Sequence, residues 1–192
     1  MTKKTLENLA KAFIGESQAR NRYTFYAKTA KKEGYEKIAE VFMVTSEQEK
    51  QHAKWLFRLL NEIKEEGVEE VTVQAETPLV FKNTVDNLKS AIEGEKYEHT
   101  QMYPEFAKVA EEEGYPDIAK RLRAIARAEE HHQERYEKIL KELERGTVFK
   151  KEKSVWWVCR ECGYHVEGTT APEVCPSCDH PQSYYEVKCE VY

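Results

Sequence analysis

Residues 129–132 read Glu-Glu-His-His and residues 49–52 read Glu-Lys-Gln-His, and these two stretches decide the fold. In each, a glutamate precedes a histidine by three positions, so on a helix both side chains leave the same face. The pattern therefore predicts two pairs, Glu49 with His52 and Glu129 with His132, each able to bind one metal ion. Two such pairs predict two metal ions.

Both pairs interrupt an apolar stripe on their helix. The stripe steps alternately by four and three residues, and every member recurs 80 residues later. The members are Ile38, Phe42, Thr45, Glu49, His52, Leu56, Leu59 and Ile63, then Ile118, Leu122, Ile125, Glu129, His132, Tyr136, Ile139 and Leu143. These acids and imidazoles should point into a core, where an unpaired charge costs several kcal/mol. A metal pair compensates that charge, whereas a solvated charged face would not explain two copies in register.

Four helices are predicted, at residues 4–32, 36–64, 84–113 and 116–145. The short link between the first two makes them antiparallel neighbours. Residues 65–84 have no helical period, and a connection of that length predicts a crossover along the bundle, as in ferritin-like folds. We therefore expect a mainly α protein built on a ferritin-like four-helix bundle with a long crossover.

The two halves of the bundle are a repeat with one inserted residue. The other repeat matches are displaced by 80, but Gly15 recurs as Gly94 after 79 residues. The extra residue lies between Glu95 and Tyr103. Because a single insertion in a helix is usually absorbed as a π-bulge, we expect one there, and it would re-aim Glu98.

The inward acids predict a ligand set for the metal pair. Four carboxylates carry the four negative charges that balance two divalent ions, and these are Glu16, Glu49, Glu95 and Glu129. With one imidazole for each metal, from His52 and His132, this oxygen-rich set suits iron or manganese better than structural zinc. Glu98 is a fifth carboxylate, useful when the pair is oxidised.

Two tyrosines occupy equivalent positions of the repeat, on the same helical face as the inward acids. Tyr23 and Tyr103 lie two turns beyond Glu16 and Glu95. They are either large core residues or partners of the ligand carboxylates, since a buried phenol needs a hydrogen-bond partner. His131 lies about 100° round the helix from His132 and is expected at the surface or as an outer neighbour of the ligands.

All five cysteines lie after residue 158. Cys159 and Cys162 form one Cys-x-x-Cys pair, and Cys175 and Cys178 form another after twelve intervening residues. Two such pairs predict a tetrahedral four-sulfur site, which could hold zinc or iron. A redox-capable metal pair in the same chain favours iron. Cys189 lies outside both pairs and is predicted to be a free thiol.

Composition separates the chain into two domains. Of the 192 residues, those before the cysteines have a helix-bundle composition, so we expect a bundle at 1–146 and a small metal-knuckle domain at 147–192. The net charge of −5 comes from mixed signs, which argues against nucleic-acid binding and a membrane anchor. No apolar run approaches membrane-spanning length, and we expect a cytoplasmic protein in which Cys-x-x-Cys pairs hold metal.

The chain resembles the rubrerythrin family over essentially its whole length, in the apolar stripes of its helices, in the internal repeat and in the cysteine-containing tail. The resemblance is carried by residues 15–23 (Gly-Glu-Ser-Gln-Ala-Arg-Asn-Arg-Tyr), 94–98 (Gly-Glu-x-x-Glu) and 102–104 (Met-Tyr-Pro), with both Glu-x-x-His pairs and both cysteine pairs. It implies a non-haem di-iron centre in the bundle and a mononuclear Fe(Cys)4 in a rubredoxin-like tail. It also implies that one iron exchanges His52 for Glu98 between redox states. Asp179 departs from the glycine usual at that position.

The resemblance implies a peroxidase that reduces hydrogen peroxide to water. The expected catalytic residues are Glu98, His52, Tyr23 and Tyr103, with Glu98 as proton shuttle. The expected electron donor is a rubredoxin or an NAD(P)H-dependent reductase, and a head-to-tail homodimer or higher assembly would bring each tail to a partner's bundle. The alternatives are a ferritin-like iron-oxidising or storage protein and a zinc-ribbon scaffold with an idle bundle.

Overall fold

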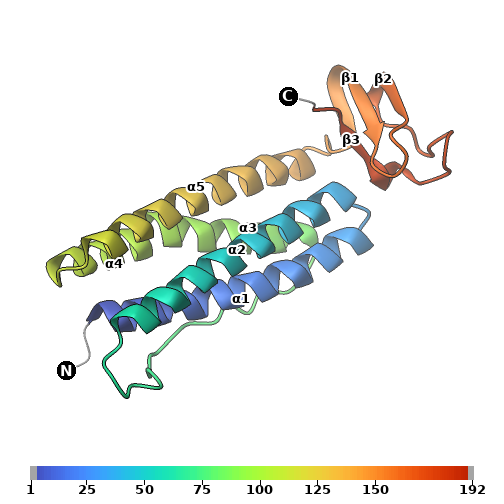
Figure 1. Cartoon of the computed structure of the whole chain (residues 1–192). Helices are drawn as coiled ribbons and strands as arrows, with labels where there is room; N and C mark the ends of the chain where they lie inside the picture. Colours follow the sequence, from blue (N-terminus) through green and yellow to red (C-terminus); the bar gives the residue numbers. More distant parts are fainter. Residues whose placement is uncertain (1–3, 190–192) are drawn as a thin grey trace.

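The structure is a computed structural model that describes residues 4–189. It is a four-helix bundle with a small sheet beyond one end (Figure 1), and each of the four long helical segments is called an arm below. The helices are α1 (Lys4–Lys32), α2 (Glu36–Ile63), α3 (Thr84–Tyr97), α4 (Tyr103–Glu112) and α5 (Pro116–Glu144). A π-helical turn, Glu98–Met102, joins α3 to α4 into one arm. The predicted mainly α, ferritin-like bundle is confirmed, and its arms end within one residue of the predicted bounds.

Identical turns end the first arm of each half. Gly34 has a φ of 83°, a left-handed conformation that costs glycine little. Its N–H donates to Lys31 O at 3.1 Å, and the Tyr35 N–H donates to Ala30 O at 2.9 Å, which together satisfy the last carbonyls of α1. Gly114, with a φ of 84°, repeats this turn before α5. Each half is therefore an antiparallel helical hairpin.

The inserted residue of the repeat lies in the π-turn. There the Tyr103 N–H donates to the carbonyl of Glu98, five residues back. The predicted π-bulge is confirmed. Its effect is to keep Tyr103 in step with Tyr23 of the first half while placing Glu98 at a position that the first half does not have.

The crossover between α2 and α3 runs along α1 to the opposite end of the bundle (Figure 1). It is attached to α1 by a hydrogen bond from the Tyr26 hydroxyl to Val80 O, 2.7 Å, and by one from Gln18 Nε2 to Glu76 O, 3.3 Å. Asn83 then caps α3, since its side chain accepts the Asp86 N–H at 2.8 Å. The long crossover predicted from residues 65–84 is confirmed.

The bundle has two apolar clusters rather than one. One cluster contains Leu9, Leu56, Tyr103, Leu122 and Ile125, and the other contains Tyr23, Phe42, Leu88, Ala91 and Tyr136. On every arm a buried glutamate lies between the two clusters along the chain. The acids therefore form a polar layer inside the core. Within residues 4–189, no helix combines the length and the apolar character needed to cross a membrane.

The tail folds into an antiparallel sheet of order β2-β1-β3, comprising β1 (Lys150–Cys159), β2 (His165–Thr170) and β3 (Tyr185–Val187), with a 3-10 turn at Gln182–Tyr184. It contacts the end of its own bundle. Arg160 Nη1 lies 3.0 Å from Glu40 of α2 and 2.8 Å from Glu186, and the rings of Tyr35 and Phe149 stack at 6.2 Å. The domain boundary between residues 146 and 147 stays a prediction.

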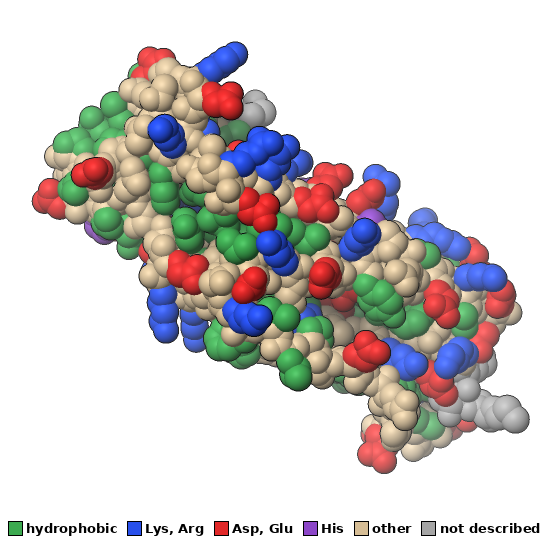
Figure 2. Space-filling view, turned by 180° about the vertical axis from the view of Figure 1, so that it is seen from behind, with side chains coloured by type: hydrophobic (Ala, Val, Ile, Leu, Met, Phe, Trp, Pro, Cys, Tyr) green, Lys and Arg blue, Asp and Glu red, His purple; other side chains and the backbone are tan. Residues whose placement is uncertain are grey.

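The surface of the bundle carries mixed charge. On the face shown in Figure 2, lysine and arginine side chains alternate with aspartate and glutamate along the whole bundle. That face has no basic stripe of the kind that follows a nucleic-acid backbone.

Candidate metal centre

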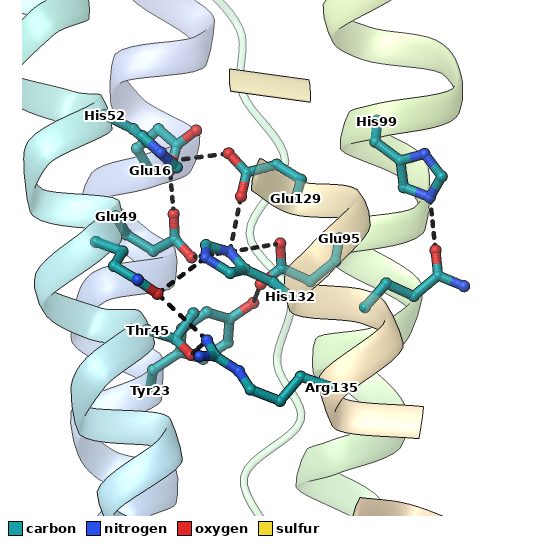
Figure 3. Close-up of polar contacts among 12 residues, drawn as sticks. Glu16, Tyr23, Thr45, Glu49, His52, Glu95, His99, Glu129, His132 and Arg135 are labelled. Atoms are coloured by element: carbon teal, nitrogen blue, oxygen red, sulfur yellow. Dashed lines mark hydrogen bonds and ion pairs between the residues drawn. The ribbon is translucent and has the colours of Figure 1, made fainter. Parts of the chain in front are cut away.

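Each arm of the bundle contributes one acid to the polar layer. Glu16 comes from α1, Glu49 from α2, Glu95 from α3 and Glu129 from α5, and none of them is more than 1% exposed. The four side chains converge with the two histidines (Figure 3). The helical period produces this arrangement, because each acid lies on the same stripe as the apolar residues above and below it.

The converging side chains form two groups of possible metal ligands. One group is Glu16, Glu49, His52 and Glu129, and the other is Glu49, Glu95, Glu129 and His132; within each group the donor atoms lie within 4.8 Å of one another. Glu49 and Glu129 belong to both groups. Shared carboxylates of this kind can bridge two metal ions.

Both imidazoles face the acids through Nδ1. His52 Nδ1 lies 2.9 Å from Glu129 Oε1 and 3.0 Å from Glu49 Oε2. His132 Nδ1 lies 2.8 Å from Glu129 Oε2 and 3.1 Å from Glu49 Oε1. Each oxygen of Glu129 thus faces a different histidine, which places Glu129 at the centre of the site.

The potential metal-ligand atoms of the two groups fit a pair of metal ions. Apart from the short contacts between imidazoles and carboxylates, six buried donor atoms of the two groups have no hydrogen-bond partner among the described residues, namely Glu16 Oε2, Glu49 Oε1, Glu95 Oε2, both Glu129 oxygens and His132 Nδ1. Orphaned buried acceptors are costly, and carboxylates packed together repel one another. Two divalent cations satisfy these atoms and cancel the four negative charges.

In the absence of metal, protons would take over part of this neutralisation. Burial, and then the charge of Glu49, raise the pKa of Glu16 from 4.5 to about 7. Burial lowers the pKa of His132, but its contacts with Glu129, Glu49 and Glu95 outweigh burial and raise it to about 12. Metal binding must displace these protons, so metal affinity should fall as the pH is lowered.

The metal-free protein should become less stable as the pH rises from about 4.5 to 7. The folded chain holds a proton on Glu16 that the unfolded chain releases near pH 4.5, so Glu16 alone contributes roughly 3 kcal/mol that is lost over this interval. Urea unfolding of chelator-treated protein at pH 5 and pH 7.5 measures the difference. In Glu16→Gln the dependence should flatten, and stability that rises with pH in the wild-type protein would contradict the assignment.

Both predicted tyrosines bond to acids of the site. The Tyr23 hydroxyl donates to Glu95 Oε1 at 2.6 Å, and the Tyr103 hydroxyl donates to Glu16 Oε1. Both phenols are buried. Each tyrosine reaches from one half of the bundle to an acid of the other half, so the pair orients the two carboxylates that are not shared between the groups.

Glu98 lies outside both ligand groups. Its Oε1 is 3.9 Å from the point where a Cβ would stand on Gly15 of α1, so its carboxyl lies beside this glycine. Burial, and then the charge of Glu16, raise its pKa well above 4.5. The predicted exchange of His52 for Glu98 stays a prediction.

Three polar residues near the site were missed from the sequence. Gln48 bonds to His132, and Arg135 bonds to both Gln48 and Thr45. A signal was present, because none of the three recurs in the other half of the repeat. His131 is exposed, as predicted.

The four paired cysteines come together in the tail. Cys159 Sγ lies 3.7 Å from Cys178 Sγ, and Cys162 Sγ lies 3.7 Å from Cys175 Sγ. A disulfide would need about 2.05 Å, whereas a tetrahedron with metal–sulfur bonds of about 2.3 Å has edges of about 3.8 Å. The geometry therefore fits one metal ion.

Each cysteine pair wraps around its metal position in the same way. The Gly163 N–H donates to Cys159 O, and the Asp179 N–H donates to Cys175 O, both at 2.9 Å. Gly163 and Asp179 both have positive φ, 77° and 58°. Asp179 thus adopts the left-handed conformation that glycine would take at a small cost, which aspartate tolerates better than most residues. Cys189 is a free, exposed thiol, as predicted.

This fold and these two sites define a di-iron carboxylate protein of ferritin-like architecture with an appended four-cysteine module. The family model for rubrerythrin matches residues 7–140, and the model for the rubrerythrin rubredoxin-like domain matches residues 157–186. A protein of Methanocaldococcus jannaschii described as a rubrerythrin is 58% identical, covering 99% of this chain and 95% of that protein. Rubrerythrin-1 of Clostridium acetobutylicum is 49% identical, covering 98% and 96%.

Solved structures agree. The fully reduced, all-ferrous state of nigerythrin superposes with a TM-score of 0.64 at 33% identity, covering 98% of this chain and 88% of that one. The chain belongs to the rubrerythrin family. Its bundle carries a di-iron site and its tail a mononuclear Fe(Cys)4 site.

Proposed function

We propose that this chain is a non-haem di-iron peroxidase that reduces hydrogen peroxide to water, taking two electrons and two protons for each peroxide. The observation that carries the proposal is the carboxyl of Glu98, which the π-turn places beside Gly15 and near the acids of the ligand groups without making it a member of either group. A site that only bound or oxidised iron would need no such group. Membership of the rubrerythrin family supports the same activity.

The proposed ligands of the iron pair are Glu16, Glu49, His52, Glu95, Glu129 and His132, with Glu98 joining when the pair is oxidised. When bound, the iron pair supplies the two electrons that break the O–O bond. The protein residues shield most of the pair from water, because the side chains of Glu49 and His132 are only 1% and 2% exposed. Tyr23 and Tyr103 hold the carboxylates of Glu95 and Glu16 in fixed orientations.

Glu98 is the proposed proton donor. A protonated carboxyl beside the metal pair can release its proton to a departing hydroxide and take up another from water afterwards. We propose that it then takes the position of His52.

The tail is the proposed electron relay, with Cys159, Cys162, Cys175 and Cys178 as ligands of the single iron. Cys162 is exposed, which offers an external donor a short approach to that iron. We propose that this donor is a rubredoxin or an NAD(P)H-dependent reductase in the cytoplasm. His132 lies twelve residues before the end of α5, roughly 18 Å along the axis, which supports a head-to-tail dimer in which each tail serves the partner's bundle.

Replacing Glu98 with glutamine should lower the rate of peroxide reduction by roughly 100-fold or more, since the amide has no proton to give. Two irons should remain in the bundle of the freshly reduced protein. Anaerobic stopped-flow mixing of reduced protein with peroxide measures the rate. Glu93→Gln, at an exposed acid on α3 just before the π-turn, is the matched control and should react at the wild-type rate. An unchanged rate in Glu98→Gln would rule out the proton role.

A titration distinguishes this function from iron storage. Anaerobic addition of hydrogen peroxide to fully reduced protein should oxidise the bundle pair with one peroxide, while metal analysis gives three irons per chain. A storage protein would instead accumulate many irons per chain and would gain nothing from its cysteine site. A colourless oxidised protein would favour the zinc-ribbon alternative.

A further inference from the structure

We infer that Gln48 and Arg135 are positioning residues that hold His132 as the permanent imidazole ligand, whereas His52 has no such support and is the one that can leave. The inference rests on the proposed assignment of both histidines as ligands. The internal repeat would make the two metal positions equivalent. The inference explains why one histidine stays bound while the other can leave.

Four hydrogen bonds build the support, and its members His132, Arg135 and Thr45 are labelled in Figure 3. Gln48 Oε1 lies 3.0 Å from His132 Nε2 and 3.2 Å from Arg135 Nη2. The same Nη2 donates to Thr45 Oγ1 at 2.6 Å, while the Thr45 hydroxyl donates to Val41 O at 2.9 Å. A guanidinium can only donate, so the Gln48 atom that faces both groups must be the amide oxygen.

This orientation determines where the imidazole proton lies. Because Gln48 Oε1 can only accept, His132 Nε2 must carry a hydrogen and donate it. Nδ1 is then free to direct its lone pair at a metal among Glu49, Glu95 and Glu129. Arg135 keeps the amide from flipping, since the reversed amide would bring its NH2 group against the guanidinium. Outer partners of this kind orient a metal-bound histidine and strengthen it as a ligand.

His52 has the same contacts with acids through Nδ1 but has, among the described residues, no hydrogen-bond partner like Gln48 at Nε2. Its Nδ1 faces Glu129 and Glu49, but no residue among positions 4–189 forms a hydrogen bond with its Nε2. Its side chain is 16% exposed, against 2% for His132. Nothing but the metal would therefore hold this ring, and solvent can reach it.

The sequence repeat shows why the two histidines differ. Eighty residues away, the counterparts of Gln48, Arg135 and Thr45 are Ala128, Trp55 and Ile125. All three polar partners are thus replaced by side chains that cannot accept a hydrogen bond from His52. Trp55 is engaged elsewhere, with the Arg121 guanidinium 3.9 Å from its ring centre. Only His132 therefore has these hydrogen-bond partners.

Proton NMR of the full chain loaded with ferrous iron tests the inference, because the N–H proton of a metal-bound imidazole is shifted out of the ordinary spectrum and exchanges with water. The wild-type protein should show one slowly exchanging N–H, from His132, and one fast, from His52. Gln48→Leu should accelerate exchange of the slow proton by roughly tenfold or more and leave the fast one unchanged. Competition with a chelator should show metal affinity falling by roughly 10–100-fold.

Matched variants separate positioning from a general loss of structure. Gln48→Glu keeps an oxygen acceptor that Arg135 can bond to, and it should restore the slow exchange. Gln51→Leu, an exposed position one turn along the same helix, should behave as wild type. If no shifted N–H appears at all, the ligand assignment fails. If both protons appear but exchange alike, or if Gln48→Leu leaves the slow one slow, the positioning role is wrong.

Discussion

Replacement of Glu129 by glutamine should remove both bundle metal ions together and abolish peroxide reduction. Glu129 is the acid whose two oxygens face different histidines, at 2.9 Å from His52 and 2.8 Å from His132. Glutamine keeps the shape but removes the charge and replaces one acceptor with a donor, so neither metal position stays complete. We expect iron to fall from three to one per chain and turnover to fall by roughly 1,000-fold or more.

Metal analysis with the visible spectrum measures this result, because the red colour of the ferric four-sulfur site should persist when the bundle irons are lost. Glu130→Gln is the matched control. Glu130 is the adjacent acid, belongs to neither ligand group and pairs with Arg127 at 3.3 Å, so its replacement should leave three irons. A Glu129→Gln protein that retains the bundle pair would contradict the central place given to this residue.

Replacement of Cys175 by serine should have the second largest effect, and it should act on a different step. Cys175 is fully buried and its sulfur lies 3.7 Å from that of Cys162, so serine would leave the four-sulfur site incomplete. We expect the red colour to disappear and turnover with an external electron donor to fall by about 100-fold or more, because the relay is lost. Chemically reduced protein should still reduce one peroxide at the wild-type rate.

Steady-state assays with a donor, beside single-turnover mixing, distinguish the two steps. Cys189→Ser is the control, since this exposed cysteine lies outside the four-cysteine group and its replacement should change neither rate. Donor-linked turnover that survives in Cys175→Ser would show that electrons reach the bundle without the tail.

The apolar stripe made much of the bundle predictable. Glu49 and Glu129 could be placed in the core because they replace apolar residues in a period that the rest of the helix keeps. The one-residue shift between Gly15 and Gly94 predicted the π-turn, and the structure has it at Glu98–Met102. Both features follow from the order of residues along the chain, the first from the period of one helix and the second from a comparison of the two halves.

The network around His132 could not be derived in the same way. Gln48 and Arg135 lie on different helices, and their meeting at one imidazole depends on how those helices are rotated against each other. The contact of Arg160 with Glu40 likewise joins residues 120 positions apart. In the sequence alone, Arg135, Arg160 and Glu40 look like any other solvated charged side chains.

The sequence by itself determined the four arms, the acid on each of them, the two histidines and the two cysteine pairs, because helical periodicity and Cys-x-x-Cys spacing are properties of neighbouring residues. Only the tertiary structure decided that Glu49 and Glu129 are shared by two ligand groups, that Glu98 lies outside both, and that one histidine is supported and the other is not. Those outcomes depend on distances between helices, which packing sets and which no single helix encodes.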